Sequence, residues 1–384
     1  MNDAPQAGAL HLSDRQRLAW LRLIRTPNVG SASFRELINR FGSAEAAIEM
    51  LPELMRRGGA VRPVRIPSIA DAEAELDQAR TCGAAFVAIG EPDYPPMLRR
   101  MDQPPPILAV KGATSVFRLP PVAIVGARNA SLAGCKFARQ IAADLGRGGY
   151  AVVSGLARGI DTAAHQGALH SGTIAAVAGG IDRPYPPENA GLLGEIAARG
   201  GAIVSEMPFG WEPRAQDFPR RNRLIAGLSL GLVVVEAARR SGSLISARLA
   251  GEMGRIVFAV PGSPLDPRAE GTNGLLKDGA ILVTSALDVF EHIAPLLPQP
   301  APSTDRLNEP PDDQGDFASA PAPADRDRAA IIEALGPTPV TVDELIQHTG
   351  QHAAQVLMVL LELDLAGRLE RHSGGAVSLL FPDS

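Results

Sequence analysis

Arginines flank a short apolar run of the chain on both sides, in an arrangement with a clear chemical meaning. The run, 232–235, reads Leu-Val-Val-Val and is followed within a few residues by Ser-Gly-Ser. The flanking arginines are Arg220, Arg221, Arg223, Arg239 and Arg240. Guanidinium groups offer permanent charge and a rigid donor fork, while glycine lets backbone N–H groups approach a ligand closely. This strand end is predicted to bind phosphate, either of a nucleotide or of a polymer.

Two earlier apolar runs end in residues of the same kinds. After 122–125 the chain reads Gly-Ala-Arg-Asn-Ala-Ser, with Arg128 at the third place. After 151–153 it reads Ser-Gly-Leu-Ala-Arg-Gly-Ile-Asp, with Gly155 and Arg158. Ligands of open parallel sheets bind beyond the carboxyl ends of the strands, so we expect the three loops to converge on one crevice.

Cofactor and catalytic patterns are missing from these loops. The dinucleotide fingerprint wants glycines where Arg128 and Ser131 stand, and no Walker A loop is present. Asp161 and His165 have the spacing of an acid/base pair, but no nucleophile or second ligand accompanies them. We expect Asp161 to cap the helix that begins at Thr162 and His165 to hydrogen-bond within the core. No catalytic residue, metal or cofactor is predicted.

Composition limits the kinds of partner. The chain has 384 residues, of which 45% are hydrophobic, and a net charge of −5, so it has length for two or three domains and any nucleic-acid site must be local. Cys82 and Cys135 fit neither a disulfide framework nor a zinc site, which favours a reducing cytoplasm. No apolar stretch reaches the length of a membrane span, and the first residues do not resemble a signal peptide, so membrane insertion is not expected.

The arginine-bearing loops must be positioned by a sheet. Apolar runs alternate with helical segments between about 71 and 295, which predicts a doubly wound, mostly parallel α/β sheet. The expected strands are 122–125, 151–153, 174–177, 202–204, 232–235, 256–260 and 281–283. The predicted domains are a small helical domain at 1–60, the sheet domain at 61–297 with its core at 121–286, a linker rich in Pro, Ala and Asp at 298–327, and a small domain at 328–384.

Long strings such as VSGLARGIDTAAHQGAL and FPRRNRLIAGLS resemble the DNA-processing protein A family, also called Smf. The resemblance covers 121 to about 286. It implies a Rossmann-like domain that binds single-stranded DNA without obvious sequence preference, protects it, and hands it to the RecA recombinase during natural transformation. It also implies a homodimer formed through this domain and a sterile-alpha-motif-like N-terminal domain.

The same resemblance, together with the loops above, gives a set of expected DNA contacts. They are Arg128, Gly155, Arg158, Arg214, Phe218, Arg221, Asn222, Arg223, Arg239, Arg240, Ser241 and Ser243. Phe218 is the candidate for stacking on a base, since aromatic rings among cations are typical of single-strand binders. The first loop departs from the family, because Ala127 and Ala130 replace a serine and a threonine. Ser131 is the hydroxyl that could substitute.

A nucleotide hydrolase of the lysine-decarboxylase-like or cytokinin-activating type is the alternative. Such enzymes carry Pro-Gly-Gly-x-Gly-Thr-x-x-Glu after the corresponding strand. Here Arg239 and Arg240 take the place of two glycines, Ser243 that of the threonine, and Ser246 that of the glutamate. A site without the acid favours holding phosphates over cleaving a glycosidic bond.

The terminal segments carry weaker patterns. Thr341 to Glu344 is a capping box, and a second helix at 356–365 with a strand at 377–380 resembles a winged helix. Its presumed recognition helix, 352–367, holds no Lys or Arg, which favours contact with protein over DNA. Near the N-terminus, 27–32 faintly resembles a helix-hairpin-helix, with Ala32 where a second hairpin glycine would be expected.

Overall fold

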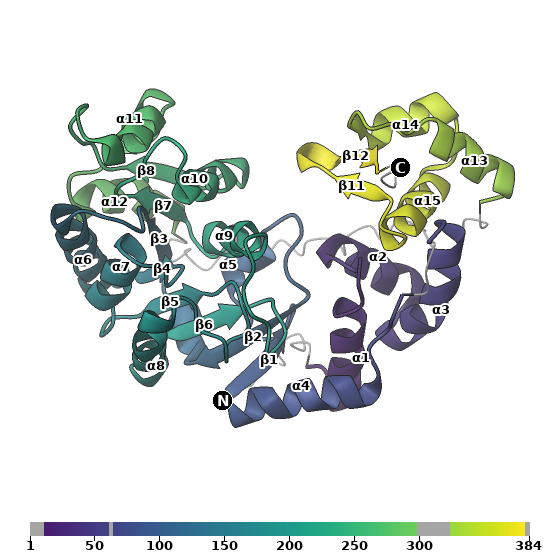
Figure 1. The fold of residues 1–384 in the computed structure, drawn as a ribbon, viewed down its shortest axis with the longest axis horizontal. Coiled ribbons are helices and arrows are strands. Elements are labelled where there is room, and N and C mark those ends of the chain that lie inside the picture. Colours follow the sequence, from purple (N-terminus) through teal and green to yellow (C-terminus); the bar gives the residue numbers. More distant parts are fainter. Residues whose placement is uncertain (1–10, 61–63, 298–322, 381–384) are drawn as a thin grey trace, which may run out of the picture. The chain divides into compact units, whose positions relative to one another are not determined.

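The computed structural model describes residues 11–60, 64–297 and 323–380. They belong to two compact units (Figure 1). Of the described residues, the sheet unit contains 11 and 74–297, and the terminal unit contains 12–60, 64–73 and 323–380. Most of the predicted linker, 298–322, lies outside the described residues, and its last residues already begin a helix, α13 (Asp325–Glu333).

The sheet unit contains a nine-stranded sheet in the order β1-β2-β6-β5-β4-β3-β7-β8-β9. The strands are β1 (Ala84–Ala88), β2 (Ile107–Gly112), β3 (Pro121–Val125), β4 (Ala151–Ser154), β5 (Thr173–Ala176), β6 (Ala202–Ser205), β7 (Gly231–Val234), β8 (Ile256–Ala259) and β9 (Ile281–Leu282). From β6 to β9 neighbouring strands are parallel, whereas β2 pairs with β1 and β6 in the antiparallel sense. The predicted doubly wound, mostly parallel sheet is confirmed, and the antiparallel edge was not predicted.

Helices cover both faces of this sheet (Figure 1). The central strands are therefore buried on both sides. Residues Val122 and Ile124 of β3 pack with α6 (Leu132–Arg147), α7 (Ile160–Gly167) and α12 (Ala286–Ile293). The alternate residues, Ala123 and Val125, pack in the cluster that holds α9 (Asp217–Gly227) and α10 (Gly242–Glu252). The other α-helices of the unit are α5 (Pro96–Arg99), α8 (Ala190–Ala198), α11 (Glu270–Lys277) and the end of α4 (Ile69–Thr81).

The strand order reverses at β3, which lies between β4 and β7. The chain runs outward from β3 through β4, β5 and β6 in one direction and, after returning, through β7, β8 and β9 in the other. Such a switch point leaves a crevice beyond the carboxyl ends of the two central strands. The loops after β3 and β7 therefore face each other across this crevice.

The terminal unit joins helices from the start of the chain to a winged helix from its end. The first part has α1 (Asp14–Ile24), α2 (Ser31–Phe41), α3 (Ala44–Arg57) and the beginning of α4 (Ile69–Thr81). The winged helix has α13, α14 (Val342–Thr349), α15 (Ala353–Leu365) and a three-stranded sheet of β10 (Val340–Thr341), β11 (Leu369–Arg371) and β12 (Ala376–Leu379). The predicted winged helix is confirmed.

Helix α15 is buried against the N-terminal helices instead of facing solvent. Its Met358, Leu361 and Leu365 belong to one core cluster with residues of α1, α2 and α3. The lack of Lys and Arg on this helix therefore has a packing reason, since a charged group there would lose its hydration. The hairpin before α2 also touches α15, because the Asn28 amide donates to the Leu365 carbonyl at 3.1 Å.

Asn28, not Ala32, takes the glycine-like conformation in that hairpin. Asn28 has a φ of 65°, while Ala32 lies in the first turn of α2. Asparagine is among the few residues that adopt this conformation at low cost. The expectation that Ala32 replaces a hairpin glycine was wrong.

Candidate functional site

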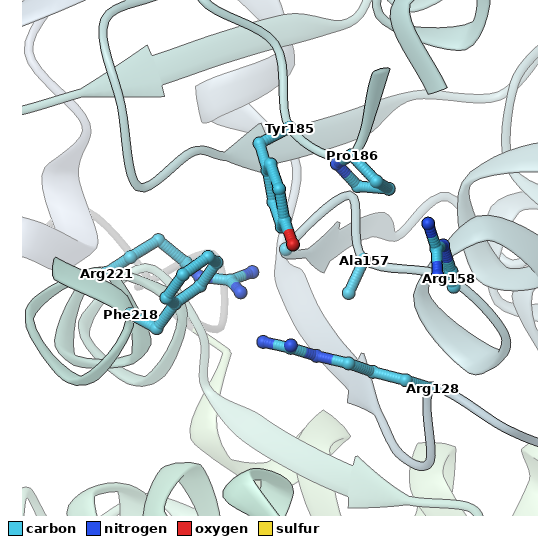
Figure 2. Close-up of a pocket in the computed structure, with 8 residues that line it drawn as sticks. Arg128, Ala157, Arg158, Tyr185, Pro186, Phe218 and Arg221 are labelled. Carbon is cyan, nitrogen blue, oxygen red and sulfur yellow. The ribbon is translucent and has the colours of Figure 1, made fainter. Parts of the chain in front are cut away.

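An open groove of about 830 Å³ runs along the crevice beyond β3 and β7. The expected contacts that line it are Arg128, Phe218, Arg221, Asn222, Arg240, Ser241 and Ser243. At one end the groove continues into a smaller recess, which adds Gly155 and Arg158 from the loop after β4 (Figure 2). The loops after β3, β4 and β7 thus converge with the start of α9, as the sequence predicted.

Phe218 lies among cations at the junction of groove and recess. The Arg128 guanidinium carbon is 5.0 Å from the centre of the Phe218 ring, and that of Arg221 is 5.9 Å away. Tyr185 meets the same ring edge-on, with 5.6 Å between ring centres. In Figure 2 the guanidinium groups of Arg128 and Arg221 point into the same space, toward which the Tyr185 hydroxyl is also directed. A ligand at this junction would therefore meet positive charge and an aromatic ring at the same place.

Arg221 is the most deeply placed of these arginines, with only 6% of its surface exposed. Its Nη1 lies 3.7 Å from Oδ2 of Asp161, too far for a hydrogen bond. Its Nε and Nη1 find no acceptor among the described residues. Gly155 makes room for it, because a Cβ at that position would lie 1.2 Å from Nη1.

Asp161 was expected to cap its own helix. Instead it holds the preceding loop in place. Its Oδ2 accepts the Gly155 N–H at 3.1 Å and the Ala157 N–H at 3.3 Å, and the helix begins after Gly159. Burial raises the pKa of this carboxyl group, and the charge of Arg221 opposes that rise. The prediction of a cap was wrong because the loop after β4 folds back over the start of α7.

His165 is a core residue, as expected. Its Nε2 accepts the Leu156 N–H at 3.3 Å, and its Nδ1 lies 2.8 Å from Oγ1 of Thr173. Since that hydroxyl donates to the Val152 carbonyl, Nδ1 carries the proton. Burial lowers the pKa of His165 to about 3. The ring is therefore neutral at physiological pH and is not poised for acid/base work.

The start of α10 forms the floor of the groove on the β7 side. Ser241 accepts the Ser243 N–H at 3.3 Å, and the two hydroxyls lie 2.7 Å apart. The Asn222 amide donates to the Gly242 carbonyl at 3.3 Å, which ties α9 to this turn. A helix start with serine hydroxyls complements negative charge.

Four expected contacts are engaged or directed elsewhere. Arg223 donates to Glu206 at 2.6 Å and lines neither hollow. Arg214 lies over the Trp211 ring at 4.5 Å, and Arg239 lines a separate hollow with Lys277. Arg158, at the rim of the recess, pairs with Glu188 at 2.5 Å. Contact of these arginines with DNA stays a prediction.

Ser131 does not offer a free hydroxyl to the groove. Its Oγ donates to Glu236 at 2.5 Å and accepts the Gly134 N–H at 2.9 Å as the cap of α6. The expectation that Ser131 substitutes for the missing family hydroxyls is therefore not supported, since Glu236, at the end of β7, occupies it.

Among the lining residues that had not been predicted as contacts are an arginine and a tyrosine. Arg268, after β8, lines the groove and pairs with Asp266 at 2.9 Å. Tyr185 lines the recess and is 47% exposed. The signal for Arg268 was its position after another parallel strand, as for Arg128. Tyr185 lies in a long loop after β5 and had no such signal.

The described ranges contain neither a metal cluster nor a membrane span. Within 11–60, 64–297 and 323–380, no group of three or more His, Cys, Asp or Glu side chains could hold a metal ion. None of the helices in those ranges is long and apolar enough to cross a membrane.

Comparison with known proteins gives matches along most of the chain. Residues 85–294 match the model of DNA recombination-mediator protein A, 14–78 a DprA-like N-terminal HHH domain, and 315–375 a DprA winged helix domain. Protein Smf of Escherichia coli is 40% identical over 291 residues, which cover 74% of this chain and 75% of that protein. DNA processing protein DprA of Streptococcus pneumoniae is 44% identical over 199 residues, covering 51% and 70%.

Solved structures give the same result. The structure of DprA from Streptococcus pneumoniae superposes with a TM-score of 0.59 at 34% identity, covering 71% of this chain and 97% of that one. A DNA processing protein A structure from Helicobacter pylori, described for its single-stranded DNA binding mode, has a TM-score of 0.51 at 28% identity and covers 56% and 97%.

Proposed function

This chain belongs to the DNA recombination-mediator protein A family, and from that membership we propose that it binds single-stranded DNA in the groove. The bound strand would be protected and handed to a RecA recombinase during natural transformation. The observation that carries the proposal is the convergence of Arg128, Arg221, Arg240 and Arg268 with Phe218 in one groove at the switch point of the sheet.

The charge of the groove supports a polyanionic ligand. The whole chain has a net charge of −5, so a nonspecific attraction to nucleic acid is not expected. The groove differs, because four arginines line it and Asp161 is the one acidic side chain among its described lining residues. Affinity for DNA should therefore arise here, through phosphate contacts that depend on salt.

The aromatic rings support a single strand over a duplex. Unpaired bases expose faces that stack on rings, and each such contact contributes about 1–3 kcal/mol. Phe218 and Tyr185 lie beside the cations at the junction of groove and recess. Phe218 is proposed as the stacking platform, with Arg128, Arg221, Arg240, Ser241 and Ser243 as phosphate contacts.

An enzymatic role as a nucleotide hydrolase receives less support. Ser246 lines the groove where the hydrolase motif would place its glutamate. Asp161 is engaged by two backbone N–H groups, and His165 is buried and neutral. Incubation with nucleoside monophosphates tests this alternative, because a hydrolase would release free base.

Partners and location complete the proposal. We expect a homodimer formed through the sheet unit and contact with RecA. We also expect a cytoplasmic location, because free cysteines are typical of a reducing compartment. Analytical ultracentrifugation and a RecA pull-down test the first two expectations.

Replacement of Arg128 by alanine tests the binding site. We expect the affinity for a labelled oligothymidine to fall by at least about tenfold and the salt dependence to weaken by about 0.7 in slope for each phosphate that is no longer neutralised. Arg118→Ala makes the same change in net charge at an exposed position of the sheet unit that lines neither hollow, and should bind as the wild type does. Equal affinity and slope for Arg128→Ala and Arg118→Ala would reject this groove as the site.

A further inference from the structure

Asp161 is an acidic side chain in a groove that we propose to bind phosphate. It shares that groove with Arg128, Arg221, Arg240 and Arg268, and only 5% of its surface is exposed. A negative charge there repels the ligand that the arginines attract. We therefore expect Asp161 to have a role in the DNA-free protein.

Two sets of contacts define that role. The carboxylate accepts the N–H groups of Gly155 and Ala157, which hold the loop after β4 in shape. It also lies 3.7 Å from Nη1 of Arg221 without bonding to it. Nε and Nη1 of Arg221 keep their hydrogens free of any acceptor in the described part of the chain.

The energetics of a buried arginine explain this arrangement. A guanidinium taken out of water without a counter-charge is strongly destabilising, so Asp161 offsets the charge of Arg221 in the free protein. Burial raises the pKa of Asp161, and Arg221 opposes that rise because its positive charge favours the ionised carboxylate. A bound phosphate would supply a second counter-charge to the same guanidinium. Asp161 and phosphate then compete for Arg221.

We propose that Asp161 is a positioning residue that keeps Arg221 in place in the free protein and, by its charge, limits how tightly the groove holds phosphate. The inference rests on the proposed binding of single-stranded DNA in this groove. Such an internal competitor would favour release, which a protein that passes its strand to another requires.

Asp161→Asn separates this role from a structural one. The amide keeps the shape and one oxygen that can accept the Gly155 N–H, but removes the charge. We expect the full-length variant to bind oligothymidine about fivefold to tenfold more tightly than the wild type. A residue that only shaped the loop would weaken binding when replaced, so the two roles predict opposite signs.

Two further variants identify the cause of the gain. Glu195→Gln makes the same change in net charge on α8, where Glu195 pairs with Arg199 and lines neither hollow. It should change the affinity by less than about twofold, as screening predicts. In an Arg221→Gln background, measured at low salt, Asp161→Asn should give a much smaller gain, because only the direct repulsion between Asp161 and phosphate is then removed. Weaker binding by Asp161→Asn, an equal gain with Glu195→Gln, or a gain that is undiminished without Arg221 would each overturn the inference.

Thermal unfolding provides a second readout. Without DNA, Asp161→Asn should unfold at a lower temperature than the wild type. Added oligothymidine should raise the unfolding midpoint of the variant by more than it raises that of the wild type. If Asp161→Asn does not fold, Asp161→Ser offers a neutral acceptor with the same expected results. Failure of the wild type to bind oligothymidine would reject the proposed function itself, whereas wild-type binding with a weaker Asp161→Asn variant rejects only this inference.

Discussion

Gly155 controls whether Arg221 can occupy the groove. A Cβ at this position would lie 1.2 Å from Nη1 and 2.4 Å from Cζ of Arg221. The backbone of Gly155 is not left-handed, so alanine is compatible with it. The guanidinium must move most, and Oδ2 of Asp161, 2.9 Å from the added Cβ, must shift slightly. We expect Gly155→Ala to fold and to lose affinity for oligothymidine by at least about tenfold, a loss typical of removing one charged hydrogen-bonding partner, as measured by fluorescence anisotropy.

A control for Gly155→Ala is available on α8. A Cβ at Gly194 would have no atom within 4 Å, and Gly194 lines neither the groove nor the recess. Gly194→Ala should bind as the wild type does. If Gly155→Ala also retained wild-type affinity, Arg221 would not be a phosphate contact.

The sequence predicted which residues gather at the site better than it predicted what each one does. Arg128, Phe218 and Arg221 meet because they follow strands or begin a helix at one edge of the sheet. That Arg223 pairs with Glu206 could not be predicted, because it depends on how two separate loops approach each other. Gly155 was expected to be a DNA contact, which stays a prediction, and its role in making room for the Arg221 side chain was not foreseen.

At the scale of elements, the end of α3 meets α15 closely at one glycine. A Cβ at Gly58 would lie 1.9 Å from the carbonyl oxygen of Glu362 and 2.9 Å from the Cβ of Ala366. Gly58 has a φ of −68°, which alanine also adopts. Gly58→Ala should therefore separate the two helices and destabilise the terminal unit by about 1–3 kcal/mol, as overpacking does. Urea unfolding followed by Trp20 fluorescence in a Trp211→Phe background measures this, because the chain has only these two tryptophans.

Gly30→Ala is the matched control for Gly58→Ala. It adds the same methyl group to the same bundle, at the start of α2, where no atom lies within 4 Å. We expect a loss of less than about 1 kcal/mol, which reflects the weaker cap alone. Equal losses for both variants would show that close packing at Gly58 contributes nothing.

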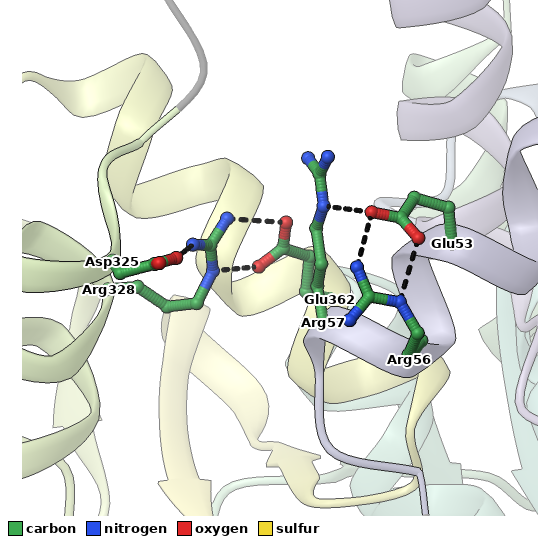
Figure 3. Close-up of polar contacts among 6 residues, drawn as sticks. All are labelled: Glu53, Arg56, Arg57, Asp325, Arg328 and Glu362. Carbon is green, nitrogen blue, oxygen red and sulfur yellow. Dashed lines mark hydrogen bonds and ion pairs between the residues drawn. The ribbon is translucent and has the colours of Figure 1, made fainter.

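Ion pairs surround this contact between helices. Arg328 bridges Glu362 of α15 and Asp325 of α13, while Glu53 of α3 binds Arg56 and Arg57 (Figure 3). The Glu362 side chain is almost fully buried, so its two bonds from Arg328 are needed to offset its missing hydration. The capping box of α14 and the amphipathic pattern of the N-terminal helices were visible in the sequence. Their pairing was not, nor was the antiparallel edge formed by β1 and β2, since each depends on a partner distant along the chain.

At the scale of the whole molecule, the two ends of the chain are joined in one folded unit. Asn28 bonds to the carbonyl of Leu365, Arg368 to that of Gly58, and Arg371 pairs with Glu36. These partners are 337, 310 and 335 residues apart in sequence. Composition separates a helical start from a winged-helix end, but it carries no information on whether two such segments bind each other.

The pair of Glu36 and Arg371 makes the stability of this unit depend on pH. Burial raises the pKa of Glu36 from 4.5 to about 7, although the charge of Arg371 opposes the rise. Burial also raises the pKa of Asp364, whose Oδ2 lies 2.9 Å from Nε of the same arginine. A carboxyl group with a raised pKa stabilises the folded state below its unfolded pKa and loses that contribution as pH rises through the folded value. The terminal unit should therefore lose up to about 3 kcal/mol of its free energy of unfolding between pH 5 and pH 8.

Glu36→Gln should remove most of that dependence and make the terminal unit more stable than the wild type at pH 8, since the amide can still accept a bond from Arg371. The measurement is the urea midpoint of Trp20 fluorescence at several pH values, in the Trp211→Phe background. Glu45, which pairs at 3.4 Å with the exposed Arg15, supplies the control, because Glu45→Gln should leave the pH profile unchanged. A wild-type stability that increased from pH 5 to pH 8 would mean that attraction to Arg371 outweighs the burial of Glu36.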